Sequence, residues 1–164
     1  MSDKIEVKLM GLILDPVSKT PVMILKPENR DKVIPIWIGI NEANTITMEL
    51  ENIVPPRPMT QDLIRRIISR LKYKVDKVVI NEIVDNTYYA ELYIKNREKI
   101  EIFDCRPSDA VAIAIKNKSK IYISEQVYSN FNLTGIAPDI LYNENKIEKW
   151  FNSLNSKDFG EIEQ

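Results

Sequence analysis

The amino-acid sequence predicts an α+β fold: one compact domain with a mixed, largely antiparallel sheet, about three packed helices and a helical C-terminal extension. Three observations lead to this prediction. The chain has 164 residues, 44% of them hydrophobic, which suffices for one core but not for two ordinary domains. Stretches that alternate apolar and polar residues, as strands do, are joined by short polar turns. Between these stretches lie segments with the apolar spacing of helices.

The N-terminal part of the chain predicts a three-stranded meander. Its first strand ends at Asp15-Pro16, where a turn rich in Pro, Ser and Thr begins. Pro35 cannot donate a hydrogen bond to a neighbouring strand, so it predicts a sheet edge or a bulge. We expect the three strands over residues 5–13, 22–25 and 33–38.

Two helices are predicted to follow the meander. Asn41 is the expected N-cap of the first, and Glu42 lies at its positive end, where it either complements the helix dipole or serves a catalytic role. Thr60 is the expected N-cap of the second, after a break at residues 54–58. The apolar face of the first helix is Ala43, Ile46, Leu50 and Ile53, and that of the second is Leu63, Ile64, Ile67, Ile68 and Leu71.

The other face of the second helix continues into the densest positive run of the chain. A run of this kind is typical of a solvated helix face, and it also suits phosphate binding. The run consists of Arg65, Arg66, Arg70, Lys72, Lys74 and Lys77, with Asp76 as its one acid. Residues 1–124 carry 20 basic and 17 acidic side chains, whereas residues 125–164 carry 3 and 7, so the mild basic excess permits nucleic-acid contact without requiring it.

The second half of the chain predicts more strands and a buried helix. Asp85-Asn86-Thr87 is expected to form a tight hairpin turn. Pro107 has the fixed φ of a first helical position, and the apolar residues after it predict a buried helix. Strands are expected over residues 75–84, 88–94, 100–103 and 121–123.

The opening of that buried helix is the strongest candidate site. Ser108 and Asp109 fall in its first turn, where such residues commonly act as helix caps. Asp104, Arg106 and Asp109 also place two acids and a guanidinium at the mouth of a buried helix, where an acid costs more to keep charged. The segment 57–63 repeats the order Arg-Pro, hydroxyl, Asp and apolar helix, so the two openings either converge on one anion site or are each ordinary capping.

The amino-acid composition excludes several catalytic mechanisms and several kinds of binding site. The chain has no histidine, which excludes Ser-His-Asp and Cys-His catalysis and histidine metal sites. Cys105 is the single cysteine, so an internal disulfide and a cysteine zinc cluster are excluded, and we expect it to be a small core residue. The four glycines are scattered and form no phosphate loop. An enzyme with this composition must use carboxylates, lysine or a metal.

A set of motifs follows in order along residues 5–127: Leu14-Asp15-Pro16-Val17, Pro35-Ile36-Trp37-Ile38-Gly39 with Glu42-Ala43, Arg57-Pro58-Met59-Thr60-Gln61-Asp62-Leu63, Tyr89-Ala90 and Arg106-Pro107-Ser108-Asp109-Ala110. Together these motifs resemble the bifunctional nuclease domain family. The resemblance implies a compact, oligomeric α+β domain with DNase and RNase activity. Many relatives carry histidine in the motif Arg-Pro-x-Thr-His-Asp-Leu, whereas this chain has Gln61 at that position, so the catalytic groups are carboxylates or this member is not an active nuclease.

Two functions are therefore predicted as alternatives. One is hydrolysis of phosphodiester bonds in single-stranded or duplex DNA or RNA, with Mg²⁺ or Mn²⁺ held by carboxylates. The other is a non-catalytic regulatory module that oligomerises and binds an anionic ligand or a partner protein. The candidate catalytic acids are Asp104, Asp109, Asp62 and Glu42, with Asp104 and Asp109 as metal ligands, and the candidate phosphate-binding residues are Arg57, Arg106, Arg65, Arg66 and Arg70.

The two ends of the chain allow predictions about localisation, the domain boundary and assembly. No apolar run is long enough to span a bilayer, and the N-terminus leads into a strand pattern without a signal-peptide core, so we expect a cytoplasmic protein without a membrane partner. We place the nuclease-like domain at residues 1–127 and an extension at 128–164. An amphipathic helix with Ile147, Trp150, Phe151 and Leu154 on one face is expected there, and it favours a homo-oligomer, most simply a dimer.

Overall fold

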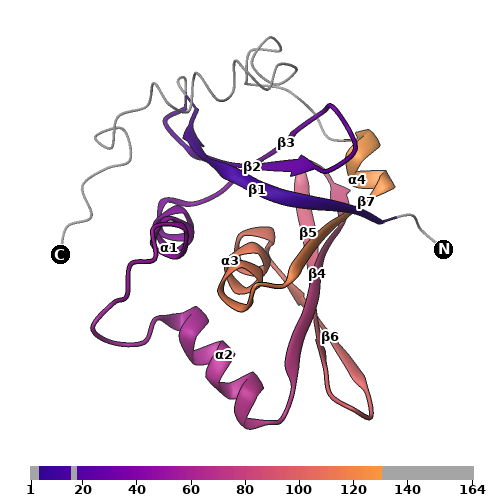
Figure 1. Ribbon diagram of the computed structural model, residues 1–164. Helices are drawn as coiled ribbons and strands as arrows, with labels where there is room; N and C mark the ends of the chain where they lie inside the picture. The colour runs from indigo at the N-terminus through magenta and orange to yellow at the C-terminus, as the bar shows by residue number, and fades with distance from the viewer. Residues whose placement is uncertain (1–3, 16–17, 131–164) are drawn as a thin grey trace.

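The computed structural model describes residues 4–15 and 18–130, which form a twisted sheet with helices packed on it (Figure 1). This arrangement confirms the predicted α+β domain. The strands are β1 (Lys4–Leu14), β2 (Pro21–Pro27), β3 (Ile34–Trp37), β4 (Lys74–Val84), β5 (Thr87–Lys95), β6 (Ile100–Cys105) and β7 (Lys120–Ser124), and the helices are α1 (Ile40–Leu50), α2 (Thr60–Arg70), α3 (Pro107–Asn117) and α4 (Glu125–Asn130).

The strands form one sheet in the order β3-β2-β1-β7-β4-β5-β6. The pair β4/β7 is parallel and the other neighbouring pairs are antiparallel, as the prediction of a mixed, largely antiparallel sheet requires. The first three strands are the expected meander, and β3, which contains Pro35, lies at a sheet edge. In the β4–β5 hairpin Asp85 and Asn86 have φ values of 48° and 61°, the left-handed conformation that a two-residue type I′ turn needs.

Helix α3 lies at the centre of the packing because of a crossover connection. The chain leaves edge strand β6, runs through α3 and returns as β7 in the middle of the sheet, so α3 passes over β4 and β5. Helices α1 and α2 then pack against α3 (Figure 1). Small residues in α3 let its backbone approach the neighbouring elements closely, and the middle of α3 is apolar around its whole circumference. Its buried apolar residues include Ala110, Val111, Ala112, Ile113 and Ala114.

The predicted N-caps of α1 and α2 are wrong by one or two positions. Gly39, not Asn41, is the N-cap of α1, and a side chain at residue 39 would collide with the Glu42 carboxylate, which folds back over it. Met59, not Thr60, precedes the first turn of α2, and its backbone N–H donates to the Asp62 carboxylate at 2.9 Å. In both helices the carboxylate of the third residue accepts a hydrogen bond from a backbone N–H group at the helix start, so no hydroxyl or amide side chain is needed as a cap.

The predicted apolar faces are also only partly buried. In α1, Ala43 and Ile46 are buried, but Leu50 and the following Ile53 are 40% and 46% exposed. In α2 the core contact is a narrow stripe through Ile64 and Ile68. The remaining apolar residues form a second stripe one position away, which is not covered by the described residues: Leu63, Ile67 and Leu71 are 54%, 49% and 63% exposed. Five apolar residues within nine positions are too many for one helix face.

The predicted domain boundary remains a prediction. Helix α4 crosses residue 127, and Val127 is fully buried. The expected amphipathic helix with Trp150 and Phe151 lies outside the described residues. Among the helices that are described, none combines the length and apolar character required to cross a membrane.

Candidate functional site

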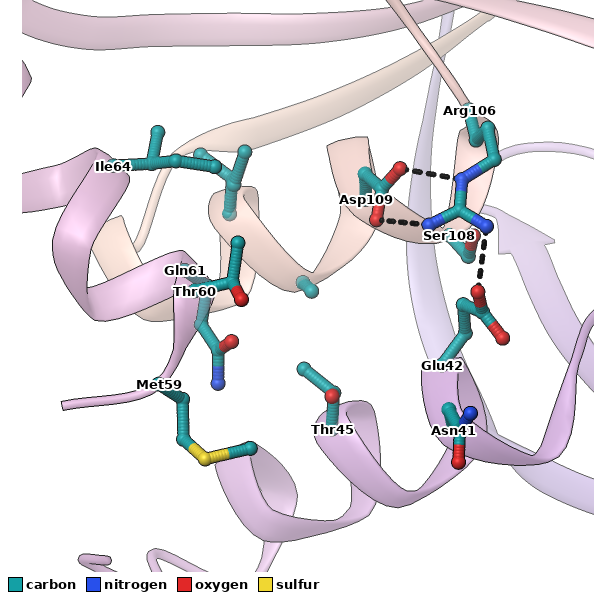
Figure 2. A pocket seen from close by; sticks show the side chains of 12 residues that line it. Asn41, Glu42, Thr45, Met59, Thr60, Gln61, Ile64, Arg106, Ser108 and Asp109 are labelled. Carbon is teal, nitrogen blue, oxygen red and sulfur yellow. Dashed lines mark hydrogen bonds and ion pairs between the residues drawn. The ribbon is translucent and has the colours of Figure 1, made fainter. Parts of the chain in front are cut away.

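A cavity of about 210 Å³ opens where the three helices begin (Figure 2). Helix α1 contributes its first two turns, α2 its first turn, and α3 its N-terminus together with Ala112 and Ile113. The first turns of α2 and α3, which follow the two Arg-Pro segments of the sequence, therefore both line this cavity, whereas Arg57 and Asp62 do not. Its polar lining residues are Asn41, Glu42, Thr45, Thr60, Gln61, Arg106, Ser108 and Asp109.

Arg106 is the centre of charge at the mouth of this cavity. Its Nε donates to Asp109 Oδ2 at 2.7 Å and its Nη2 to Asp109 Oδ1 at 3.0 Å, a bidentate pair (Figure 2). Its Nη1 donates to Glu42 Oε1 at 2.6 Å. The Arg106 side chain is 64% exposed, whereas Glu42 is 22% exposed. Two acids from different helices thus share one guanidinium that solvent can reach.

Hydrogen bonds and neighbouring charges favour the charged forms of Glu42 and Arg106. The Glu42 carboxylate accepts a hydrogen bond from its own backbone N–H, which lowers its pKa; burial opposes this, and Arg106 lowers the pKa further. Hydrogen bonds to Asp109 and then to Glu42 raise the pKa of Arg106 above its usual value. At neutral pH the cluster therefore has two negative charges around one positive charge, at the positive ends of two helix dipoles.

The expected capping role of Ser108 and Asp109 is replaced by this arrangement. Arg106 is the N-cap of α3, Pro107 follows it as predicted, and Ser108 and Asp109 occupy the second and third helical positions. The side chain of the N-cap residue makes no capping hydrogen bond to the backbone N–H groups of the helix. Asp109 directs both carboxylate oxygens to Arg106. Asp109 therefore stabilises the start of α3 through its negative charge and not through a capping hydrogen bond.

Asp62 belongs to a different cluster. Lys116, near the end of α3, contacts Asp62 Oδ1 at 2.8 Å and Glu49 Oε1 at 2.9 Å, and so joins all three helices. The three side chains are only 13% to 20% exposed. The bond from Lys116 lowers the pKa of Asp62, and the bonds from Asp62 and Glu49 raise the pKa of Lys116. Asp62 does not line the cavity, and its contacts are those of a structural ion pair.

Asp104 lies apart from Asp109. It is an exposed residue of β6, paired in register with Glu91 of β5. Because strand side chains alternate, Asp104 is on the side of the sheet opposite the one that Cys105 and the helices share. It does not line the cavity. No group of three or more His, Cys, Asp or Glu side chains within residues 4–15 and 18–130 is arranged to hold a metal ion.

The remaining predicted arginines lie on the surface, outside the lining of the cavity. Arg57 is in the connection between α1 and α2, and Arg65, Arg66 and Arg70 are exposed on α2. None of them lines the cavity. Cys105 is half-buried, and burial, followed by nearby acids, raises its thiol pKa to about 11. A thiol with this pKa stays protonated at neutral pH, so it is unsuited to nucleophilic attack.

A second cavity of about 370 Å³ adjoins the first. Glu42, Arg106 and Ser108 line both hollows. Its other walls come from β3, from Gly39 and from the β4–β5 turn, and they include Trp37 and Tyr88. Trp37 and Tyr88 fall within the predicted strands 33–38 and 88–94, and nothing in the local sequence indicates a cavity between these distant hairpins.

Gln61, like Ser108, is a buried polar residue of the first cavity. It is 7% exposed and lies in the first turn of α2. This is the position that the resemblance associates with histidine. The residue at this position therefore faces the same cavity as Arg106, Glu42 and Asp109.

Comparison with known proteins gives a family match and several relatives. The model of the bifunctional nuclease domain matches residues 23–134. An uncharacterised protein of Mycobacterium tuberculosis is 35% identical over 158 residues, which are 92% of this chain and 93% of that protein. Bifunctional nuclease 1 of Oryza sativa subsp. japonica is 32% identical over 120 residues, 71% of this chain and 36% of the rice protein. Bifunctional nuclease 1 of Arabidopsis thaliana is 26% identical over 109 residues, 64% of this chain and 34% of the plant protein.

Proposed function

We propose, on the premise that the chain belongs to the bifunctional nuclease domain family, that it hydrolyses phosphodiester bonds of nucleic acids at the cavity beside Arg106. The observation that carries the proposal is the cluster at the cavity mouth. One exposed guanidinium holds two carboxylates, and two helix N-termini point their partial positive charge at the same place. A phosphodiester is an anion that guanidinium groups and helix N-termini both bind.

The cluster suggests how this chain's own groups act. A phosphate oxygen competes with the carboxylates for Arg106, which then orients the phosphodiester and neutralises charge that develops on its oxygens. A water molecule attacks the phosphorus and the bond to the leaving oxygen breaks. A released carboxylate accepts one proton of the water, and the leaving oxygen takes up a proton from solvent. We assign this last role to Asp109, because Glu42 is held as a weak base by its backbone hydrogen bond.

The donor set also suits a divalent cation. Mg²⁺ and Mn²⁺ prefer oxygen ligands, and Mg²⁺ commonly uses one or two carboxylates together with substrate phosphate oxygens. Glu42 and Asp109, which converge on Arg106, would hold the ion; Asp104, the other ligand expected from the sequence, lies on the opposite side of the sheet. Such an ion supplies Lewis-acid polarisation of the phosphate and lowers the pKa of bound water.

An activity assay tests the proposal directly. The purified full chain is incubated with labelled single-stranded and duplex DNA and RNA, with EDTA and with added Mg²⁺ or Mn²⁺. We expect metal-dependent cleavage by the natural sequence and by Arg97→Gln, which removes an exposed arginine distant in sequence from the cavity. Arg106→Gln should reduce the rate at least about 100-fold, the scale of removing a transition-state donor. Equal rates in the two variants would contradict the assignment of the site.

The alternative of a non-catalytic module is supported by two observations. Arg106 is already neutralised by two acids, and Gln61 occupies the position where many relatives carry histidine. In this case the cavity binds an anionic ligand or a partner protein without turnover. Oligonucleotide binding that Arg106→Gln abolishes, together with no cleavage in Mg²⁺ or Mn²⁺, would favour it over the nuclease.

A further inference from the structure

The second cavity has the composition of a site for a flat aromatic ligand. Trp37 and Tyr88 contribute aromatic walls, and Asn86 and Thr87 of the hairpin turn contribute polar groups. The volume, about 370 Å³, is within the range of small-molecule pockets. Gly39 also lines the cavity next to Glu42, and it has no side chain that would narrow the cavity there.

Both aromatic side chains are held in place by hydrogen bonds. Trp37 Nε1 donates to Asp15 Oδ2 at 3.0 Å, and Asp15 is only 5% exposed. The Tyr88 hydroxyl donates to the Pro35 carbonyl at 3.5 Å. Tyr88 is half-buried, and burial raises its pKa to about 12, so its hydroxyl stays neutral at physiological pH. Rings fixed in this way lose little conformational freedom when a ligand stacks on them.

The position of this cavity relative to Arg106 identifies the ligand class. Glu42, Arg106 and Ser108 form the wall that the two cavities share. A phosphate bound at the guanidinium therefore has a cavity with two aromatic walls next to it, where the adjoining nucleoside would lie. Aromatic side chains bind successive bases by stacking with little sequence preference, and a base can stack in this way only when it is unpaired.

We infer that the second cavity is a subsite for one unpaired nucleobase, so that the chain takes single-stranded DNA or RNA in preference to duplex. The inference rests on the proposed binding of a phosphodiester at Arg106. Trp37 and Tyr88 supply the stacking surface, and Asn86 and Thr87 supply polar contacts to the base edge. Because stacking on the two rings supplies most of the binding energy and every base can stack, the subsite accepts any of the bases.

Fluorescence of Trp37 gives a test that leaves the cavity intact. Trp150→Phe makes Trp37 the single tryptophan, since the chain has two. This variant is titrated with an eight-residue single-stranded DNA, with an abasic oligonucleotide of equal length and charge, and with the matching duplex. We expect the single strand to quench Trp37 emission and to bind roughly tenfold more tightly than the abasic strand, as stacking of one base predicts. The duplex should quench weakly.

Variants at the cavity provide the second measurement. Trp37→Leu should lower the affinity for the single strand to that for the abasic strand and leave the abasic affinity unchanged. Trp37→Phe keeps an aromatic ring and should retain most of the difference. Tyr89→Leu, which removes the exposed tyrosine adjacent in sequence to Tyr88, serves as the matched control.

The outcomes separate this inference from the proposed function. Equal affinities for single-stranded and abasic DNA, or unchanged Trp37 emission on binding, would overturn the base subsite and leave phosphodiester binding at Arg106 intact. Equal binding of duplex and single strand would overturn the preference for unpaired bases. If none of the oligonucleotides binds, or if Arg106→Gln binds them all normally, the proposed function fails and the subsite with it.

Discussion

At the scale of single residues, three acids occupy equivalent local positions but have different partners. Glu42, Asp62 and Asp109 each lie third in a helix, where a negative charge complements the dipole. Glu42 and Asp109 meet on the exposed Arg106, whereas Asp62 binds the half-buried Lys116. An acid on an exposed arginine can exchange its partner for a phosphate or a metal, and an acid in a half-buried ion pair cannot do so without loss of stability.

Asparagine substitutions distinguish the two aspartates that the sequence assigned to a metal. Asp109→Asn should abolish metal-dependent cleavage and lower the free energy of unfolding by no more than about 1 kcal/mol, because its ion pair is exposed. Asp104→Asn should leave both quantities unchanged, because Asp104 lies on the other side of β6. Cleavage rates and urea titrations of the two variants measure this. Loss of cleavage in Asp104→Asn would restore the pair of ligands expected from the sequence.

Gln61 offers a gain-of-function test at the same scale. An imidazole in this buried position of the first cavity could accept or donate a proton near neutral pH, which the amide of Gln61 cannot do. If the chain is a nuclease, Gln61→His should raise the cleavage rate by about tenfold or more and add a titration near pH 6.5 to the pH–rate profile. A rate and profile identical to those of the natural sequence would argue against proton transfer at this position.

At the scale of elements, Lys116 is the connection that fixes the helices around the cavity. It links the end of α1 to the start of α2 from α3. Because the first turn of α2 carries both Asp62 and the cavity-lining Thr60 and Gln61, the cluster holds this turn against α1 and α3. Removing the lysine would leave Glu49 and Asp62 as two uncompensated acids in a partly buried place.

Lys116→Met should therefore lower the free energy of unfolding by about 2 kcal/mol at pH 7, less than for a fully buried pair. The pKa of Asp62 is lowered in the folded state, so its contribution is present above about pH 4 and is lost as the pH falls through the lowered pKa. The pKa of Lys116 is raised, so its contribution is present up to about pH 10 and is lost as the pH rises through the raised pKa.

The difference between Lys116→Met and the natural sequence should consequently be largest from about pH 5 to pH 9 and shrink at both extremes. Urea titrations across this range measure it. Lys120→Met, which removes the exposed lysine paired with Glu6, is the matched control and should change stability little at any pH. A pH-independent difference for Lys116→Met would indicate a packing effect instead of the ion cluster.

Helix α2 has a second role in the proposal, because the exposed Arg65 and Arg66 directly follow its cavity-lining residues Thr60, Gln61 and Ile64 in the sequence. Arg65→Glu with Arg66→Glu should weaken oligonucleotide binding at low salt and reduce the slope of log affinity against log salt by about 2, since each arginine that contacts a phosphate contributes about one. The effect should be the same for different sequences, because these residues have no base-reading arrangement. Affinity measured from 50 to 200 mM salt tests this; an unchanged slope would move the nucleic-acid surface elsewhere.

At the scale of the whole molecule, two apolar surfaces are uncovered by the described residues. One is the stripe on α2 formed by Leu63, Ile67 and Leu71. The other is edge strand β6, where Ile100, Ile102 and Phe103 are about half exposed and the outer backbone groups have no neighbouring strand in the sheet. Surfaces of this kind are typical of protein interfaces, which agrees with the homo-oligomer expected from the sequence.

Light scattering at micromolar concentrations should accordingly give the mass of a dimer. Leu63→Glu with Ile67→Glu should reduce the mass to that of one chain, and Val84→Glu, at an exposed apolar position outside α2, should not. A dimer that persists in the α2 variant but is lost in Ile102→Lys would place the interface on the edge strand. A mass of one chain for the natural sequence would refute the predicted oligomer.

The sequence by itself determined the strands, the helices α1, α2 and α3 and the N-terminal meander, but not the short helix α4 or the complete strand order of the sheet. Alternating apolar residues define strands, and Asp85-Asn86 suits a left-handed two-residue turn; both signals act over a few neighbouring residues. Pro107 at the start of a helix and Pro35 at a sheet edge follow from the geometry of the proline ring. The family also follows from the order of the motifs.

The tertiary structure decided which of these residues act together. Glu42 and Arg106 are 64 positions apart, and they meet because the β6-α3-β7 crossover brings α3 against α1. The same crossover places Lys116 on Asp62, and the described residues leave one stripe of α2 uncovered. Local patterns cannot predict these outcomes, because the three acids are equivalent along the chain and only the packing of the helices on the sheet gives each a different partner.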